Sequence, residues 1–461
     1  MLLKEYIRCD VTELAKRIKT REISPHEAMD CALSRINEVN TTLNAIVTDC
    51  SDFAKKCLTS LRGDEPFYGV PLLIKDLGHW IAGVRSTEGS RFFSHNISPI
   101  TSDLVNKMIS LGFIPIAKTN TPELGLSYVT EPTLLGPCRN PYDLNRTPGG
   151  SSGGSAAAIA AGIAPISTAS DGGGSIRIPA ACCGLFGFKP TTGITPTGPL
   201  TDELWSGLAV NFVLTRSLRD SEALFNELAE LSRVRPLHPH KKLNILHLEG
   251  VFAPVPVATP CIEAVNKVEE LLKKLGHTIQ RKYLALDLNA IGDCVIKIIA
   301  ANTYTVIKLQ EAQLSQKAKP DALEPITWEF YKRGEALSAY EYIVARTRLF
   351  QLVQPLHQLL DQTDVVLTPA LAQLPLLIGG LSTNEEFDLY LQKNMEFSPF
   401  TSLFNQAGLP AMTLPVMFDN QLPISVQMGA AKGNDLLLYA LAKELQPLLP
   451  DFNQLMPLNS G

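Results

Sequence analysis

The stretch that decides the fold is residues 147–180, TPGGSSGGSAAAIAAGIAPISTASDGGGSIRIPA. Two clusters of glycine and serine lie on either side of an alanine-rich segment without charges, which predicts a buried helix. Ser151 lies in the first cluster and Ser175 in the second, 24 positions later. Glycine permits backbone conformations that other residues avoid, and serine supplies a hydroxyl group. The clusters therefore indicate a gathering of hydroxyl groups and backbone amides, which acyl transfer requires.

Length and composition are those of a globular enzyme. Of the 461 residues, 45% are hydrophobic and 19% charged, which is too apolar for a disordered chain. The net charge of −5 argues against nucleic acid as the main partner, because phosphate binding needs a surplus of basic residues. Nine cysteines without a C-x-x-C pair predict free thiols rather than a disulfide framework or a zinc site. We expect no metal and no cofactor.

The expected location is the cytoplasm, without membrane association. The first ten residues, MLLKEYIRCD, carry charges that interrupt any apolar run, so they do not resemble a secretory signal. Residues 147–170 lack charges and are long enough to span a bilayer, but their glycines, serines and prolines favour a buried helix. The expected partner is a small-molecule amide substrate, and a homodimer is compatible with the sequence.

The order of the predicted elements indicates an α/β fold. Two helices open the chain, because Asp10 precedes Glu13 and Ser24-Pro25 precedes Glu27 at N-cap spacing. Short apolar runs at 68–74 and 113–117 alternate with helical patterns, which predicts a single large mixed, mostly parallel twisted sheet with helices on both faces. Later strands are predicted at 243–248, 278–279, 364–369, 411–416 and 424–428, and later helices at 261–275, 325–360 and 434–445.

We expect one domain over residues 1–461. Its predicted parts are N-terminal helices (1–65), a catalytic core (66–232), an insertion that shapes the pocket (233–360) and a C-terminal part of the core (361–461). The polar, proline-containing segment 233–240 is the predicted linker or surface loop.

The second glycine cluster can supply both a nucleophile and its electrostatic support. In the run SDGGGS at 170–175, the amide of Ser175 and those of the three preceding glycines can converge on one oxygen. A tight turn before a strand is the alternative interpretation. A phosphate-binding loop is disfavoured, because the G-x-x-x-x-G-K-[ST] pattern is absent.

The base of such a site has to be sought away from histidine. The first cluster matches the G-x-S-x-G elbow with Ser151 or Ser152 at its centre, but no downstream histidine lies in a motif that resembles a catalytic loop. Lys75 directly follows an apolar run, and burial would lower its pKa and leave it neutral. The alternative is a lysine paired with a neighbouring carboxylate such as Asp76.

Several separated motifs resemble the amidase signature family. The likeness covers nearly the whole chain, and the motifs follow one another in the family's order. The matching segments are GVPLLIKD at 69–76, KTNTPE at 118–123, GGSSGGSAAA at 149–158, SDGGGSIRIPA at 170–180, CGLFGFKPT at 183–191, and Asn405 with GLPA at 408–411.

The resemblance implies a Ser-cisSer-Lys triad. By position, Ser175 matches the nucleophile that forms an acyl-enzyme, Ser151 the bridging serine with a cis peptide bond, and Lys75 the base. The interval of 24 residues selects Ser151 rather than Ser152 as the bridge. The amides that match the oxyanion hole are those of Gly172, Gly173, Gly174 and Ser175, and the supporting residues are Asp171, Arg177 and Ser152.

The implied reaction is hydrolysis of a carboxamide to a carboxylic acid and ammonia or an amine. The lysine and nucleophile motifs are also similar to the branch that opens the cyclic dimer of 6-aminohexanoate. Two alternatives are the glutaminase subunit of a tRNA-dependent amidotransferase, whose late tyrosine- and arginine-rich signature we do not find, and a catalytically silent binding member. Gly172 stands where many members carry threonine, which predicts a looser loop or a wider pocket. The pocket lining is expected from residues 200–400.

Overall fold

An eleven-stranded sheet forms the centre of the protein. The computed structural model describes residues 1–237, 242–249, 255–452 and 457–458. The spatial order of the strands is β1-β3-β2-β4-β6-β5-β10-β11-β9-β7-β8. Their bounds are β1 Ile46–Asp49, β2 Pro71–Lys75, β3 Ile114–Thr119, β4 Ile166–Asp171, β5 Phe186–Lys189, β6 Val210–Thr215, β7 Asn244–Glu249, β8 Thr278–Tyr283, β9 Val365–Pro369, β10 Ala411–Asp419 and β11 Leu422–Ala430.

Four of the ten strand pairings are parallel and six are antiparallel. The α/β class and the single large mixed sheet are therefore confirmed, whereas the prediction of a mostly parallel sheet is wrong. One reason is that β10 and β11 form a hairpin whose turn, Asn420–Gln421, has positive φ at both residues. Another is that β6 runs antiparallel to both β4 and β5. Alternation of helix and strand along a sequence does not report the direction in which a strand returns to the sheet.

The central strands are covered on both faces. Every residue of β2, β3, β6, β9 and β11 is buried. Because successive side chains of a strand point to opposite faces, this pattern requires packing on both sides of the sheet. The edge strand β8, in contrast, exposes most of its residues.

Sixteen α-helices surround the sheet in the described part of the chain. The predicted N-caps are confirmed, since the side chains of Asp10 and Ser24 accept hydrogen bonds from the amides of Glu13 and Glu27. The helices are α1 Leu3–Arg8, α2 Val11–Lys19, α3 Pro25–Leu43, α4 Ser51–Ser60, α5 Asp103–Ser110, α6 Gly153–Ala160, α7 Arg177–Cys182, α8 Leu218–Leu228, α9 Thr259–Lys274, α10 Leu288–Leu314, α11 Pro325–Ala336, α12 Ala339–Leu352, α13 Gln354–Gln362, α14 Phe387–Phe397, α15 Ser402–Gln406 and α16 Asp435–Leu445.

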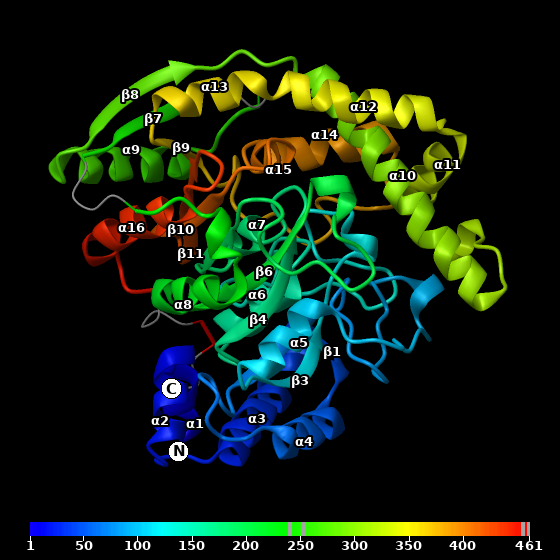
Figure 1. Ribbon diagram of the computed structural model, residues 1–461, viewed down its shortest axis with the longest axis vertical. Coiled ribbons are helices and arrows are strands. Elements are labelled where there is room, and N and C mark those ends of the chain that lie inside the picture. Colours follow the sequence, from blue (N-terminus) through cyan, green and yellow to red (C-terminus); the bar gives the residue numbers. More distant parts are fainter. Residues whose placement is uncertain (238–241, 250–254, 453–456, 459–461) are drawn as a thin grey trace.

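The two ends of the molecule are built by different helices. Figure 1 shows α1–α4 at the bottom of the view and α12 and α13 across the top. The chain's last described residues return to the N-terminal helices, because the Arg35 guanidinium donates to the carbonyl oxygen of Leu458. The division into four parts stays a prediction, and residues 238–240 of the predicted linker lie outside the described residues.

Helix α10 is the largest element without a counterpart in the sequence predictions. It has 27 residues and packs on α11 and α12. By length and composition it is also the one described helix that could cross a membrane, with 39% of its most apolar window buried inside the protein. Buried core helices meet the same criterion.

The stretch 147–180 folds around a short buried helix. Helix α6 has eight residues, all buried, and lies against β4 and β2. The second glycine–serine cluster begins where β4 ends, at Asp171. Strand β2, which pairs with β4, ends at Lys75. The sheet therefore brings the predicted base and the predicted nucleophile loop to the same edge.

Candidate active site

Lys75 lies at the end of β2 and is completely buried. Its Nζ donates hydrogen bonds to Ser151 Oγ at 2.7 Å and to Ser170 Oγ at 2.9 Å. Its backbone amide donates to Thr168 Oγ1 on the neighbouring strand β4. The side chain is thereby held between two hydroxyl groups, one from each of the two glycine–serine clusters.

Burial makes Lys75 a base near neutral pH. Desolvation lowers the pKa of Lys75 from its usual 10.5 to about 7, although the negative charges of Asp171 and Glu88 act in the opposite direction. The alternative pairing with Asp76 is wrong, because Asp76 forms a buried ion pair with Lys118 at 2.6 Å. The Asp76 carboxylate also accepts hydrogen bonds from the amide and hydroxyl of Thr87. No carboxylate in the described part of the chain forms an ion pair with Lys75.

Ser151 occupies the position predicted for a bridging serine. The Gly150–Ser151 peptide bond is cis, as the resemblance implied. The carbonyl oxygen of Ser151 accepts a hydrogen bond from Thr121 Oγ1 at 3.0 Å. Ser152 points elsewhere, since its hydroxyl donates to the carbonyl oxygen of Ser170. Of the two adjacent serines, only Ser151 contacts Lys75, which agrees with the assignment made from the interval.

Ser175 lies next to this pair and is 6% exposed. Its carbonyl oxygen accepts a hydrogen bond from the amide of Ser152 at 3.3 Å, which joins the two clusters. The Ser175 hydroxyl makes no hydrogen bond to another described residue, whereas the Ser151 hydroxyl is engaged by Lys75. Ser175 is therefore the hydroxyl of the two that is available to an incoming carbonyl group.

The glycine loop supplies fewer free amides than the sequence predicted. The amide of Gly174 donates to Asp171 Oδ1 at 2.7 Å, so the prediction that it faces the oxyanion is wrong. The amides of Gly172, Gly173 and Ser175 make no hydrogen bond within the described residues and stay available as donors. The carbonyl oxygen of Gly173 is fixed by Thr401 Oγ1 at 2.7 Å and by the Tyr128 hydroxyl at 3.1 Å. The loop is thus held from behind while three amides remain unpaired.

Asp171 and Arg177 form the predicted supporting pair. Both are fully buried, and the guanidinium contacts both carboxylate oxygens at 2.9 Å. Burial alone would raise the pKa of Asp171, but the charge and hydrogen bonds of Arg177 hold the pKa well below its usual value. Asn405 also donates to the Asp171 carboxylate and to the carbonyl oxygen of Leu208. Because Asp171 accepts the amides of Gly174 and Ile176, the pair fixes the shape of the loop around Ser175.

Sequence reasoning missed three polar residues beside the lysine. Ser170 is the second acceptor of the Lys75 ammonium, and Thr168 accepts the lysine's backbone amide. His79 lies between Thr168 Oγ1 at 2.8 Å and Asn211 Oδ1 at 3.0 Å, and burial lowers the pKa of His79 to about 3. Their signal was the alternation of hydroxyl groups along β4 and a histidine four residues after Lys75, which a search confined to downstream histidines passed over.

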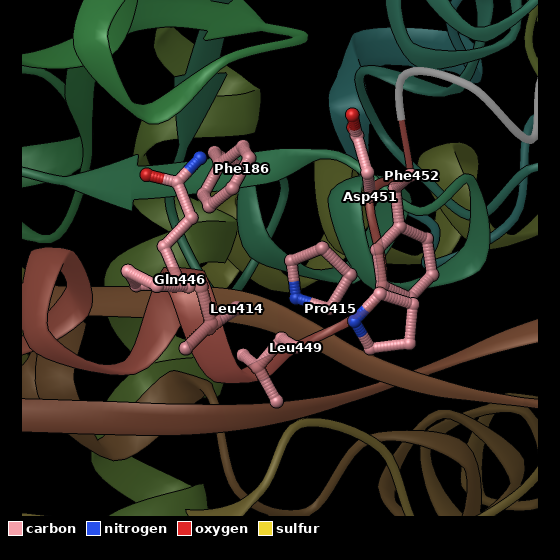
Figure 2. A pocket seen from close by; sticks show the side chains of 9 residues that line it. Phe186, Leu414, Pro415, Gln446, Leu449, Asp451 and Phe452 are labelled. Atoms are coloured by element: carbon pink, nitrogen blue, oxygen red, sulfur yellow. The ribbon is translucent and has the colours of Figure 1, made fainter.

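The largest surface cavities lie away from these residues. One, of about 340 Å³, lies between β10 and the C-terminal segment and is shown in Figure 2. Its lining includes Phe186, Leu414, Pro415 and Phe452, and none of the predicted site residues contributes to it. It has no arrangement of groups for acyl transfer, so the chemistry is assigned to the edge of the sheet at Lys75.

The arrangement at Lys75 defines a class of enzyme. A buried, neutral lysine that contacts one serine, next to a glycine loop ending in a second serine, is a serine hydrolase site with a lysine base. Comparison with known proteins agrees. A family model described as Amidase matches residues 27–438. The chain therefore belongs to the amidase family and is a hydrolase of carbon–nitrogen amide bonds.

Individual relatives cover almost the whole chain. A lipoamidase of Enterococcus faecalis is 29% identical over 95% of this chain, which spans only 63% of that relative's length. A 6-aminohexanoate-cyclic-dimer hydrolase of Paenarthrobacter ureafaciens is 29% identical over 96% of this chain and 95% of the relative. A solved structure of 6-aminohexanoate cyclic dimer hydrolase matches with a TM-score of 0.89 at 27% identity, covering 96% of this chain and 97% of the other.

Proposed function

We propose that this protein hydrolyses a carboxamide through an acyl-enzyme on Ser175. The observation that carries the proposal is the 2.7 Å hydrogen bond between the fully buried Lys75 Nζ and Ser151 Oγ. It joins a base whose pKa lies near 7 to a hydroxyl that can pass a proton to and from the neighbouring Ser175. These intact groups argue against a catalytically silent member of the family.

The proposed first half-reaction forms the acyl-enzyme. Neutral Lys75 takes the proton of Ser151 as Ser151 takes that of Ser175, and Ser175 Oγ bonds to the substrate's carbonyl carbon. The oxyanion that develops accepts hydrogen bonds from the free amides of Gly172, Gly173 and Ser175. Lys75 then returns its proton through Ser151 to the amide nitrogen. The carbon–nitrogen bond breaks, and ammonia or an amine leaves.

The second half-reaction repeats the path with water. Water attacks the ester carbonyl while Ser151 and Lys75 accept its proton, and the proton then returns to Ser175 as the acid leaves. An amide nitrogen is a poor leaving group unless it is protonated, so the step requires a base that can act as an acid afterwards. A lysine with a pKa near 7 meets both requirements, since both protonation states are accessible at neutral pH.

The proposed substrates are linear or cyclic carboxamides of low molecular weight. Two findings support this class over glutamine bound to an amidotransferase complex. The relatives include a lipoamidase and a cyclic-dimer hydrolase, and the chain matches the fold of the latter over almost its full length. A cytoplasmic location and a homodimer are further proposals, the first supported by nine free cysteines.

A fluorophosphonate probe tests the nucleophile. We expect one covalent adduct per chain, mapped by peptide mass spectrometry to Ser175 and absent in Ser175→Ala. Ser152→Ala is the matched control and should retain the adduct, because its hydroxyl faces the Ser170 carbonyl oxygen. A panel of primary, aryl and cyclic amides and glutamine, assayed for released ammonia or amine, then identifies the substrate. An adduct on another serine, or none, would overturn the proposal.

A further inference from the structure

A tight hairpin beside the oxyanion loop has an unusual backbone. Leu204 and Ala209 pair across it, and the amide of Ala209 donates to the carbonyl oxygen of Leu204 at 3.1 Å. At its tip, Trp205 and Ser206 have φ values of 48° and 54°. Residues with a Cβ rarely adopt this left-handed conformation, and consecutive ones persist only where the surroundings impose it. The contacts of the hairpin show what imposes it here.

The helical layer clamps the tip of the hairpin. Ser206 Oγ accepts hydrogen bonds from Asn302 Nδ2 on α10 at 2.9 Å and from the Tyr342 hydroxyl on α12 at 2.7 Å. Near its base, the carbonyl oxygen of Leu208 accepts from Asn405, which also holds Asp171. The hairpin is therefore fixed at one end to the pocket-forming insertion and at the other to the oxyanion loop.

The indole ring of Trp205 lies against the first glycine of that loop. A Cβ at Gly172 would come within 2.9 Å of Trp205 Cε3 and 3.1 Å of Cζ3. The sheet register explains the placement, because β6 begins one residue after Ala209 and its Val210 pairs with Asp171. The prediction of a wider pocket at Gly172 is therefore wrong, since the indole occupies the space that a side chain would take. Trp205 nevertheless remains partly exposed.

We propose that Trp205 determines the substrate specificity of this amidase, as the apolar wall of the substrate pocket beside the oxyanion loop. The inference rests on the proposed role of Ser175 and specifies its substrate class. An amide whose carbonyl oxygen is held by the amides of Gly172 and Gly173 places its neighbouring substituent next to the indole. A flat or extended apolar group packs on that ring and gains binding energy, whereas a very small amide leaves the contact unmade.

Gly172 and Trp205 should behave as one unit. Gly172→Ala drives a methyl group into the indole, so we expect kcat/KM to fall by about tenfold or more on every substrate. In a Trp205→Ala background the same methyl group has room, and the further loss should be within about threefold. Additive losses would show that the ring does not occupy the loop's missing side-chain space and would overturn the placement.

Substrate selectivity provides the decisive measurement. kcat and KM are measured for acetamide, hexanamide and benzamide, and for acetanilide as the arm that varies the amine side. We expect Trp205→Ala to reduce the preference for hexanamide, benzamide or acetanilide over acetamide by about tenfold or more, and Trp205→Phe to reduce it less. Trp328→Phe, which alters a ring stacked on Tyr331, is the matched control and should keep every ratio within about twofold. Unchanged ratios in Trp205→Ala would refute the inference.

Two further readings separate possible failures. Fluorophosphonate labelling of Ser175 in each variant shows that the acyl-enzyme chemistry persists, so loss of labelling in the wild type would defeat the proposed function instead. If Trp205→Ala does not fold, indole fluorescence replaces it. Titration with benzamide should change the emission of the wild type and of Trp328→Phe but leave that of Trp205→Phe unchanged. An equal change in all three proteins would overturn the contact.

Discussion

Replacing Lys75 by methionine should make the protein more stable at neutral pH while it destroys activity. Methionine is unbranched and apolar, so it can occupy the buried channel of the lysine stem without a charge. The substitution removes two hydrogen bonds, those to Ser151 and Ser170. It also removes the cost of keeping an ionisable amine out of water. Only the second effect depends on pH, which allows the two to be separated.

The magnitude follows from the pKa of Lys75, 10.5 when exposed and about 7 in the folded protein. Below pH 10.5 the unfolded chain binds a proton that the folded protein does not bind until the pH approaches 7. Each pKa unit corresponds to about 1.4 kcal/mol, so the lysine lowers the free energy of unfolding progressively over this window. Between pH 10 and pH 7 the stability of Lys75→Met relative to the wild type should therefore rise by roughly 3–4 kcal/mol. Below pH 7 it should rise little further.

Urea unfolding at pH 7 and pH 10 measures this difference. The lost hydrogen bonds shift both values equally and cancel. Lys55→Met, at a position that is 64% exposed, controls for the removal of a lysine. The wild-type kcat/KM should rise with pH and level off above about 7, and Lys75→Met should lose about 10²- to 10⁴-fold. Equal relative stability at both pH values would mean that folded Lys75 is charged, which would refute the reasoning.

Other variants test the remaining assignments. Ser175→Ala should abolish turnover with an unchanged urea midpoint, whereas Ser152→Ala should retain activity within about tenfold, and steady-state rates distinguish them. Arg177→Lys loses the two-pronged contact with its buried carboxylate, so the free energy of unfolding should fall by about 3–5 kcal/mol, and an unchanged urea midpoint would contradict this. His79→Asn should leave the acid limb of the pH–rate profile near pH 7, because a neutral histidine with a pKa of about 3 cannot produce it, whereas loss of the limb would assign it to His79.

The parts of the site that could be predicted are those fixed by local sequence. The apolar run before Lys75 predicted both the buried strand and the buried amine. The interval between the two clusters separated Ser151 from Ser152, and only Ser151 contacts the lysine. Capping residues marked the first helices for the same reason, since the side chain and the amide that it binds are three residues apart.

The parts that failed depend on segments far apart in the chain. The direction of a strand is decided by where the chain returns, which hydrophobic patterns do not record. The amide of Gly174 was expected to face the substrate, but the carboxylate of Asp171 competes for it. At Gly172 the missing side chain suggested empty space, yet Trp205 fills it from a hairpin that no nearby motif announces. Each error concerns what a distant or competing group does to a correctly identified residue.

The neutrality of Lys75 depends on the pairing of the carboxylates around it. Asp76 is adjacent in sequence but is committed to Lys118, and Asp171 is committed to Arg177. Glu88 is buried among hydrogen-bond donors, and burial raises its pKa, which reduces the negative charge that it brings. Each of these groups would otherwise raise the pKa of the lysine and hold it in the charged form. Two buried ion pairs, neither of which includes Lys75, therefore leave the amine with serine hydroxyls as its only described side-chain partners, and that isolation makes it a base.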